Sequence, residues 1–351
     1  MDELGCQGLE PTSPIIRSLS DVSMRRDGLL AAITAASRKQ RAGPLRAGSR
    51  LMRPQTEETL GFYLCIAPWI IGFLAFALGP MVYSIFLSLA KWDIIGTPRF
   101  IGLGNYQRAL FKDDLFWQSL KVTLVYSFGE VPLRLTVGLL LALLLNQGVW
   151  LRAFFRTLFY VPSVISGVAV ALLWMWVFNP DFGVLNYVLG LVGIQGPQWI
   201  YSEEWALPSL IIMSVWGAGQ GMIIFLAGLQ GVPQSLYDAA VVDGAGAWRK
   251  FWNVTLPMLS PVVLFNLVMG VINSLQVFTQ AFVMTNGGPH YATYFMVLYI
   301  YNLAFNYLDM GMASTVAWAL FVVILVLTLL IFRSTPFWIY YETELRKRQK
   351  A

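Results

Sequence analysis

The sequence predicts an all-α membrane protein with six transmembrane helices. Of its 351 residues, 57% are hydrophobic and only 12% are charged, and the mean hydropathy is +0.62. A soluble domain of ordinary size does not need so much apolar material. Because a bilayer core about 30 Å thick requires about 20 apolar residues per helix, each charge-free stretch of that length predicts one span.

Six stretches of the chain meet this requirement. The first lies within 59–90 and contains Pro68 and the pair Gly79 and Pro80, which predict a kink or a helix followed by a re-entering turn. The other five lie at about 122–146, 157–178, 205–229, 258–284 and 311–332. A further apolar stretch, 291–307, is rich in Tyr and Asn and is expected to pack at the outer membrane interface.

The distribution of Lys and Arg predicts which side of the membrane each loop faces, because positive charge resists export across the bilayer. Nine Lys or Arg precede the first span and five follow the sixth. The loops after the second and fourth spans hold Arg152, Arg156, Arg249 and Lys250, whereas the loops after the third and fifth hold none. The loop after the first span has five, together with three Asp. We therefore expect both termini in the cytoplasm.

The order of polar and apolar segments divides the chain into three parts. Residues 1–58 mix Arg, Ser, Gly and Pro with little periodicity and are expected to form a disordered basic cytoplasmic tail. Residues 59–333 form the transmembrane domain, and 334–351 form a basic cytoplasmic C-terminal tail. Within the transmembrane domain, the loop 236–258 is unusual because it is neither very short nor strongly polar.

The pattern of this loop predicts two short amphipathic helices joined at a glycine turn. Apolar residues recur at roughly helical spacing on both sides of Gly244 and Gly246, where glycine can adopt backbone angles closed to other residues. Pro257 is expected to interrupt the hydrogen-bond ladder and redirect the chain into the fifth span. The loop would expose an apolar, aromatic-rich surface, which indicates a partner with a matching groove.

The loop resembles the EAA loop of the permease subunits of ABC importers, which are the inner membrane components of binding-protein-dependent transport systems. The matching residues are Asp238, Ala239, Ala240, Asp243, Gly244, Ala245, Phe251, Leu256 and Pro257. The family usually has Glu at the head of the motif, where this chain has Asp238 with the same charge. Three further segments, 102–106, 155–180 and 285–289, are similar to the carbohydrate branch, which includes permeases for maltose, trehalose and glycerol 3-phosphate.

The resemblance implies a type I ABC importer permease fold in the inner or plasma membrane, with the EAA loop docking as a coupling helix on a separate ATPase. The implied partners are a second related permease, two copies of the ATP-binding subunit, an extracytoplasmic solute-binding protein and the sugar. The sequence contains no G-x-x-x-x-G-K-[ST] motif. ATP and Mg²⁺ are therefore expected on the ATPase, with no cofactor and no catalytic residue on this chain and no nucleic acid among its partners.

Polar side chains within the fourth and fifth spans are candidates for contact with the sugar, because amides, hydroxyls and an aromatic platform are what a sugar site requires. The candidates are Trp216, Gly217, Gln220, Asn273, Ser274 and Gln276. In the maltose-type permeases the sugar site lies on the helices either side of the EAA loop, and Gly217, Gln220 and Ser274 fall at similar positions. Hydrogen bonding between helices, without cargo contact, is the alternative for each residue.

Two charged residues fall inside the second span. Glu130 and Arg134 are four apart and can pair along one helix face. Pairing is favoured over substrate contact, because an isolated charge at mid-bilayer costs about 2.5–3.5 kcal/mol or more. A phosphate-bearing cargo would give Arg134 a second role, since a guanidinium binds phosphate in a bidentate manner. The glycine-rich segment 217–221 is expected to allow close helix packing.

Two other classes of protein remain as alternatives. An ion-gradient-driven secondary transporter or channel would need a titratable group in the membrane, for which Glu130 is the main candidate. An intramembrane enzyme would need paired carboxylates or a His-bearing motif, and the predicted spans contain neither. Cys6, Cys65 and His290 lack neighbours at metal-ligand spacing, so no metal site is predicted.

Overall fold

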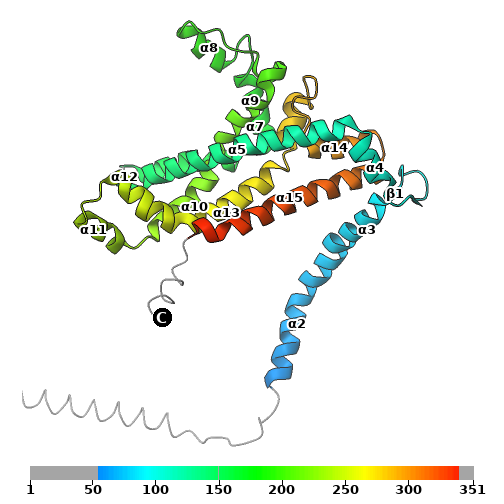
Figure 1. Ribbon diagram of the computed structural model, residues 1–351, viewed down its shortest axis with the longest axis horizontal. Helices are drawn as coiled ribbons and strands as arrows, with labels where there is room; N and C mark the ends of the chain where they lie inside the picture. The colour runs from blue at the N-terminus through cyan, green and yellow to red at the C-terminus, as the bar shows by residue number, and fades with distance from the viewer. Residues whose placement is uncertain (1–53, 149, 340–351) are drawn as a thin grey trace, which may run out of the picture. The chain divides into compact units, whose positions relative to one another are not determined.

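The computed structural model describes residues 54–148 and 150–339 as an almost entirely helical chain (Figure 1). Four helices are long and apolar enough to cross a membrane: Gly61–Ser88, Asp114–Asn146, Ala247–Ser274 and Met310–Trp338. Two bent helix pairs meet the same test, Arg152–Ser163 with Gly167–Val177 and Glu203–Val215 with Gly219–Gln230. If each bent pair is one span, the described residues contain six, which confirms the predicted fold class.

The chain divides into two compact units, 1–72 and 73–351. The described part of the first unit lies in helix α2, Pro54–Phe73. The second unit begins with the π-helix η1 (Leu74–Leu78), helix α3 (Gly79–Ser88) and the strands β1 (Ala90–Lys91) and β2 (Arg99–Phe100), which pair antiparallel with Ala90 opposite Phe100. Its first half continues with α4 (Gly104–Phe111), α5 (Asp114–Asn146), α6 (Arg152–Tyr160), η2 (Val161–Ser163), α7 (Gly167–Val177), α8 (Val184–Leu191) and η3 (Trp199–Tyr201).

The remaining elements of the second unit complete the bundle. They are α9 (Glu203–Val215), α10 (Gly219–Gln230), α11 (Gln234–Val242), α12 (Ala247–Lys250), η4 (Phe251–Thr255), α13 (Leu256–Ser274), η5 (Ala281–Thr285), α14 (Met296–Tyr301), η6 (Asn302–Asn306) and α15 (Met310–Trp338). Helix α5 contacts α9, α10, α13 and α14, and α15 packs on α3, α13 and α14. Several helices thus pack against α5, the longest helix described.

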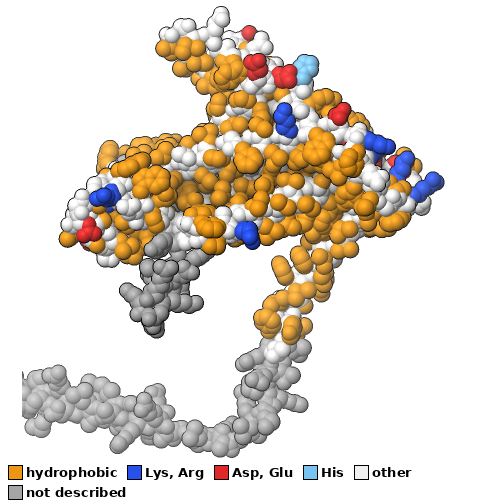
Figure 2. Space-filling model, viewed as in Figure 1, with side chains coloured by type: hydrophobic (Ala, Val, Ile, Leu, Met, Phe, Trp, Pro, Cys, Tyr) orange, Lys and Arg blue, Asp and Glu red, His pale blue; other side chains and the backbone are white. Residues whose placement is uncertain are grey.

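The second unit presents apolar side chains outward as well as inward. Large residues such as Phe128, Leu140 and Leu329 are more than half exposed, as expected for helices whose outer faces contact lipid. In Figure 2 hydrophobic side chains cover most of the visible flank, and most charged ones lie near α4, near α11 and along the upper edge. This distribution suits a body surrounded by hydrocarbon with polar groups at both surfaces.

Carboxylate caps fix the end of the bundle near α4. Asp113 precedes α5 and accepts hydrogen bonds from the Leu115 N–H at 3.1 Å and from the Tyr299 hydroxyl. Burial, followed by the hydrogen bond to Asp113, raises the pKa of Tyr299. Asp309 precedes α15, accepts from the Met312 N–H at 3.0 Å and pairs with Arg108 at 2.8 Å. These contacts tie both long helices to the short elements around them.

The third and fourth spans differ from the sequence-based expectation of single helices at 157–178 and 205–229. The third is bent by 95° around residues 164–166, shortly after Pro162, and the fourth is bent by 43° around residues 216–218. Proline removes a ladder hydrogen bond in the third, and three glycines within five residues weaken the helix in the fourth.

The fifth span begins earlier and ends earlier than expected. Helix α12, η4 and α13 form one 28-residue run, Ala247–Ser274, so Pro257 does not redirect the chain. Proline is tolerated there because it occupies the start of α13, after the π-helix η4 has already disturbed the ladder. The chain leaves the helix at Leu275, so Gln276 lies beyond its end rather than on it.

The Tyr-rich segment 291–307 packs against the bundle, and its expected position at the outer membrane interface stays a prediction. Phe295, Met296 and Leu298 are fully buried, because α14 packs against α5 and α15. The Met296 N–H donates to the Thr123 hydroxyl at 2.9 Å, which fixes the segment inside the bundle.

The two predicted tails overlap the ends of helices, and the division of the chain at 58 and 334 stays a prediction. Helix α2 begins at Pro54 and α15 continues to Trp338, so five residues of each predicted tail are helical. The expected disorder of the rest, including Cys6, lies outside the described residues.

Candidate functional site: a polar path beside α5

A cavity of about 340 Å³ lies beside α5, between the start of α7, the end of α9 and the residues that follow α13. We call it the first cavity. It contains five of the six residues that the sequence predicts as sugar contacts: Trp216, Gly217, Asn273, Ser274 and Gln276. It is also lined by Gln280, which belongs to the same polar stripe of the sequence, and by Tyr126, which the prediction omitted. The first cavity therefore brings amides, hydroxyls and the half-buried ring of Trp216 together.

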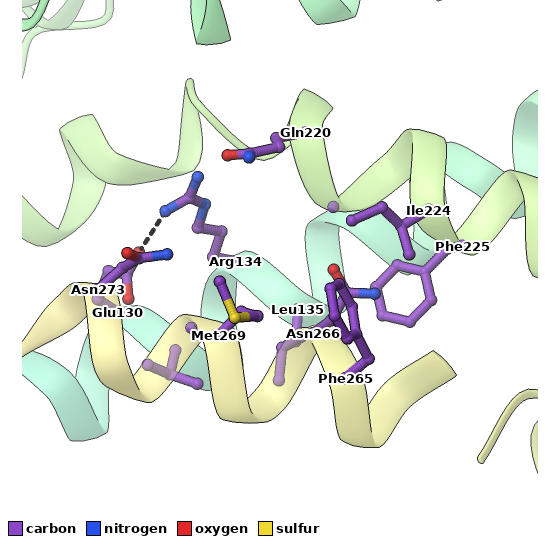
Figure 3. Close-up of a pocket in the computed structure, with 13 residues that line it drawn as sticks. Glu130, Arg134, Leu135, Gln220, Ile224, Phe225, Phe265, Asn266, Met269 and Asn273 are labelled. Carbon is purple, nitrogen blue, oxygen red and sulfur yellow. Dashed lines mark hydrogen bonds and ion pairs between the residues drawn. The ribbon is translucent and has the colours of Figure 1, made fainter. Parts of the chain in front are cut away.

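A second cavity of about 150 Å³ lies between α5, α10 and α13 (Figure 3). Its uncharged polar side chains are the amides of Gln220, Asn266 and Asn273, and its apolar wall includes Phe225 and Phe265. Gln220, the sixth predicted contact, belongs to this cavity. Asn266 donates to the Val262 carbonyl at 3.0 Å, so one of its donors already serves the helix.

Three residues line both cavities: Glu130, Arg134 and Asn273. Arg134 Nη1 lies 3.2 Å from Glu130 Oε1, which confirms the expected pairing along α5. Arg134 Nη2 also donates to the Gly217 carbonyl at 3.2 Å. In Figure 3 the Arg134 side chain extends from α5 toward Gln220 on α10. The pair thus stands where the two cavities adjoin.

Ser274 supports the alternative of bonding between helices. Its hydroxyl is buried, donates to the Val271 carbonyl at 3.0 Å and lies 2.5 Å from the Ser127 hydroxyl of α5. The Ser274 hydroxyl oxygen therefore has one lone pair left to accept a hydrogen bond from a cargo molecule. Asn273 and Gln276 lack such a partner among the described residues and retain their amides for the cavities.

The bend in the fourth span places Trp216 and Gln220 on different cavities. The N–H groups of Trp216, Gly217 and Ala218 bond three residues back rather than four, which tightens the chain at the bend. Beyond it, a Cβ atom on Gly219 would lie 1.9 Å from the Phe159 carbonyl oxygen of α6. The expectation of close packing at this glycine-rich segment is thereby confirmed, and the bend is an additional feature.

The EAA loop, residues 236–258, forms the predicted pair of helices, α11 and α12, with Gly244 between them at φ +73°. The Gly244 N–H donates to the Val241 carbonyl at 3.0 Å, and the Ala245 N–H donates to the Ala240 carbonyl at 2.8 Å. These two bonds make a Schellman motif, which requires a left-handed residue at the position of Gly244. The other matched residues are Asp238 and Ala239 in α11, Asp243 at its C-cap, Phe251 in η4, and Leu256 and Pro257 at the start of α13.

The surface of this loop is apolar and open. Val242 is 87% exposed and Trp248 is 74% exposed, and Trp248 stacks on Phe251 with ring centroids 6.1 Å apart. Large exposed side chains next to Arg249 and Lys250 distinguish the loop from the uncharged, lipid-facing flanks. Such a combination is typical of a surface that meets another protein.

The family model described as "Binding-protein-dependent transport system inner membrane component" matches residues 134–336. The chain belongs to this family. The probable ABC transporter permease protein YesP of Bacillus subtilis is 44% identical over 292 residues, covering 82% of this chain and 94% of that protein. The trehalose/maltose transport system permease protein MalF of Thermococcus litoralis is 35% identical over 279 residues, covering 78% and 92%.

Solved structures agree with this membership. A bacterial alginate ABC transporter, crystallised with its periplasmic protein bound to an alginate pentasaccharide, contains a chain that superposes with a TM-score of 0.70. The two chains are 26% identical, and the match covers 80% of this chain and 96% of that one. The resemblance recognised in the EAA loop is confirmed, and this permease is a multi-pass membrane protein.

Proposed function

We propose that this permease forms half of the translocation path of an ATP-driven importer for a sugar. The observation that carries the proposal is the pair of adjoining cavities, which are lined by the amides of Asn273, Gln276 and Gln220 and by the half-buried Trp216. Neutral hydrogen-bonding groups beside an aromatic ring suit a polyol better than an ion or an apolar molecule. The trehalose/maltose transport system for which the MalF relative is named supports the same cargo class.

The EAA loop is proposed to couple the path to a separate ATPase subunit. Its exposed apolar surface follows directly from α10 and leads without interruption into α13, and both helices line the second cavity. A displacement of the loop would therefore move two walls of the path. The proposed assembly adds a second permease, two ATPase copies and a solute-binding protein, in an inner or plasma membrane with both termini cytoplasmic. ATP and Mg²⁺ belong to the ATPase, and this subunit is not itself an enzyme.

Uptake by the reconstituted importer tests the proposal against an ion-gradient-driven transporter. Proteoliposomes that contain both permeases and the ATPase are supplied with loaded binding protein and radiolabelled sugar. We expect accumulation that requires enclosed ATP and persists when ionophores collapse proton and sodium gradients. Accumulation that follows the gradients and ignores ATP would overturn the proposal.

Replacing Trp216 by alanine is expected to lower sugar uptake at least tenfold, because the first cavity loses its aromatic platform. ATPase stimulation by the loaded binding protein should change less than twofold, since the EAA loop is untouched. The matched control is Trp150→Ala, which removes an 84% exposed tryptophan outside both cavities and should leave uptake unchanged. Equal uptake by the two variants would exclude Trp216 from the path.

A further inference from the structure

The Glu130–Arg134 pair is asymmetric in what it presents to the path. The Glu130 side chain is 3% exposed, whereas the Arg134 side chain is 30% exposed. Glu130 Oε2 is enclosed and has no hydrogen-bond partner among the described residues. Although both residues line both cavities, a molecule there can therefore reach the guanidinium more readily than the enclosed carboxylate.

The guanidinium also has donors to spare. Arginine carries five N–H donors in a planar fork. One donor of Arg134 serves Glu130 Oε1 and one serves the Gly217 carbonyl. In the described part of the chain no acceptor is found for the other three, and the side chain lines both cavities. Arg134 is thus held from two sides and keeps three donors for a molecule in the path.

The charges that line the path favour an anion at this face. Arg134 and Glu130 are the only charged residues among those that line the two cavities. An anionic group in front of Arg134 would lie nearer to the guanidinium than to the buried carboxylate, so attraction exceeds repulsion. Glu130 removes the net charge of the empty path and keeps the fork oriented. Its negative charge limits the attraction without cancelling it.

We propose that Arg134 binds an acidic group of the transported sugar and that Glu130 is a positioning residue behind it. This inference rests on the proposed sugar path and refines its cargo to an acidic sugar, with Asn273, Gln220 and Trp216 contacting the uncharged ring. The shared chemistry is an oxyanion, either the carboxylate of a uronic acid or the phosphate of a sugar ester. A guanidinium fork accommodates both.

Three probes that share one ring test the proposal: galactose, galacturonate and galactose 6-phosphate. Binding to the complete importer in nanodiscs, without ATP or binding protein, is measured by ligand-observed NMR. We expect at least one acidic probe to bind tenfold or more tightly than galactose, and the tighter one identifies carboxylate or phosphate as the preferred source. Raising the salt concentration should weaken only the acidic probes.

Substitutions of Arg134 and Glu130 distinguish recognition of the charge of the sugar from a purely structural role of the pair. Arg134→Gln should weaken the acidic probe at least tenfold and change galactose binding less than threefold, and Arg134→Lys should restore part of the loss. Glu130→Gln should leave the acidic probe bound as tightly or more tightly, with a steeper salt dependence. Lys121→Gln is the matched control, since it removes a cation from an exposed position of α5 outside both cavities.

The double variant Glu130→Gln/Arg134→Gln keeps the net charge of the span. It replaces the single variant as the test if Arg134→Gln does not fold. We expect the double variant to lose the preference for the acidic probe. Three results would overturn the inference. The wild type could bind galactose as tightly as both acidic probes, Arg134→Gln could lose all probes equally, or the double variant could keep its preference for the acidic probe. With ATP-driven uptake of a neutral sugar intact, such a result leaves the proposed function standing. Absence of ATP-driven uptake of any sugar is the separate result that removes the proposed function.

Discussion

Replacing Gly244 by proline is expected to abolish stimulation of the ATPase by loaded binding protein while leaving the permease inserted and assembled. Gly244 has φ +73°, and the proline ring holds φ near −65°. Proline would also remove the N–H that donates to the Val241 carbonyl. The Schellman motif would be lost, and α11 and α12 would no longer present their exposed side chains in one arrangement. Stimulation is measured as ATP hydrolysis by the reconstituted importer with and without loaded binding protein.

The same turn supplies the control. Gly246 has φ −68°, and a Cβ atom there would meet nothing within 4 Å. Gly246→Ala should therefore retain stimulation within about twofold. Gly244→Ala should fall between the two, since alanine in the left-handed region costs roughly 1–2 kcal/mol. Full stimulation in Gly244→Pro would remove the coupling role of the loop.

The helical pair of the EAA loop was predictable because its signals are local. Apolar spacing around Gly244 sets the two helices, and the turn depends on bonds between residues at most five apart. The end of α13 was not predictable in this way. Residues 258–284 contain no charged side chain, so nothing in their composition marks the end of the helix. Non-helical backbone at membrane depth is tolerated where it is buried in protein or lines a cavity. Gln276 was therefore assigned to a helix that stops at Ser274.

Spacing also predicted the pairing of Glu130 with Arg134, since residues four apart share a helix face. It could not predict which partner would face the path. That depends on the Gly217 carbonyl, 83 positions along the chain, which holds Arg134 at the bend of the fourth span. The bend itself lies at three glycines. From these glycines the sequence pattern indicated the close approach of α10 to α6, but not the bend.

Replacing Gly219 by alanine is expected to destabilise the permease strongly. The new Cβ atom would lie 1.9 Å from the Phe159 carbonyl oxygen, 2.7 Å from its carbon and 3.1 Å from Tyr160 Cα. All three are backbone atoms, so no side chain can rotate away and α10 must move from α6. Overpacking typically costs about 1–3 kcal/mol and sometimes more, and a backbone clash of this size belongs at the upper end. Thermal unfolding of the detergent-solubilised importer should show a clearly lower midpoint and reduced yield.

Gly221→Ala separates this clash from the general effect of adding a methyl group to a glycine-rich helix. Gly221 lies two residues further along α10, and its nearest neighbour would be the Asn266 amide oxygen at 3.3 Å, the end of a side chain that can adjust. Alanine is also favoured over glycine within a helix by about 0.5–1 kcal/mol. The midpoint of Gly221→Ala should therefore equal or exceed that of the wild type. If both variants unfolded at the wild-type temperature, the contact between α10 and the Phe159 backbone would not be essential to the fold. The bend that separates Trp216 from Gln220, and with it the division of the path into two cavities, would then need another cause.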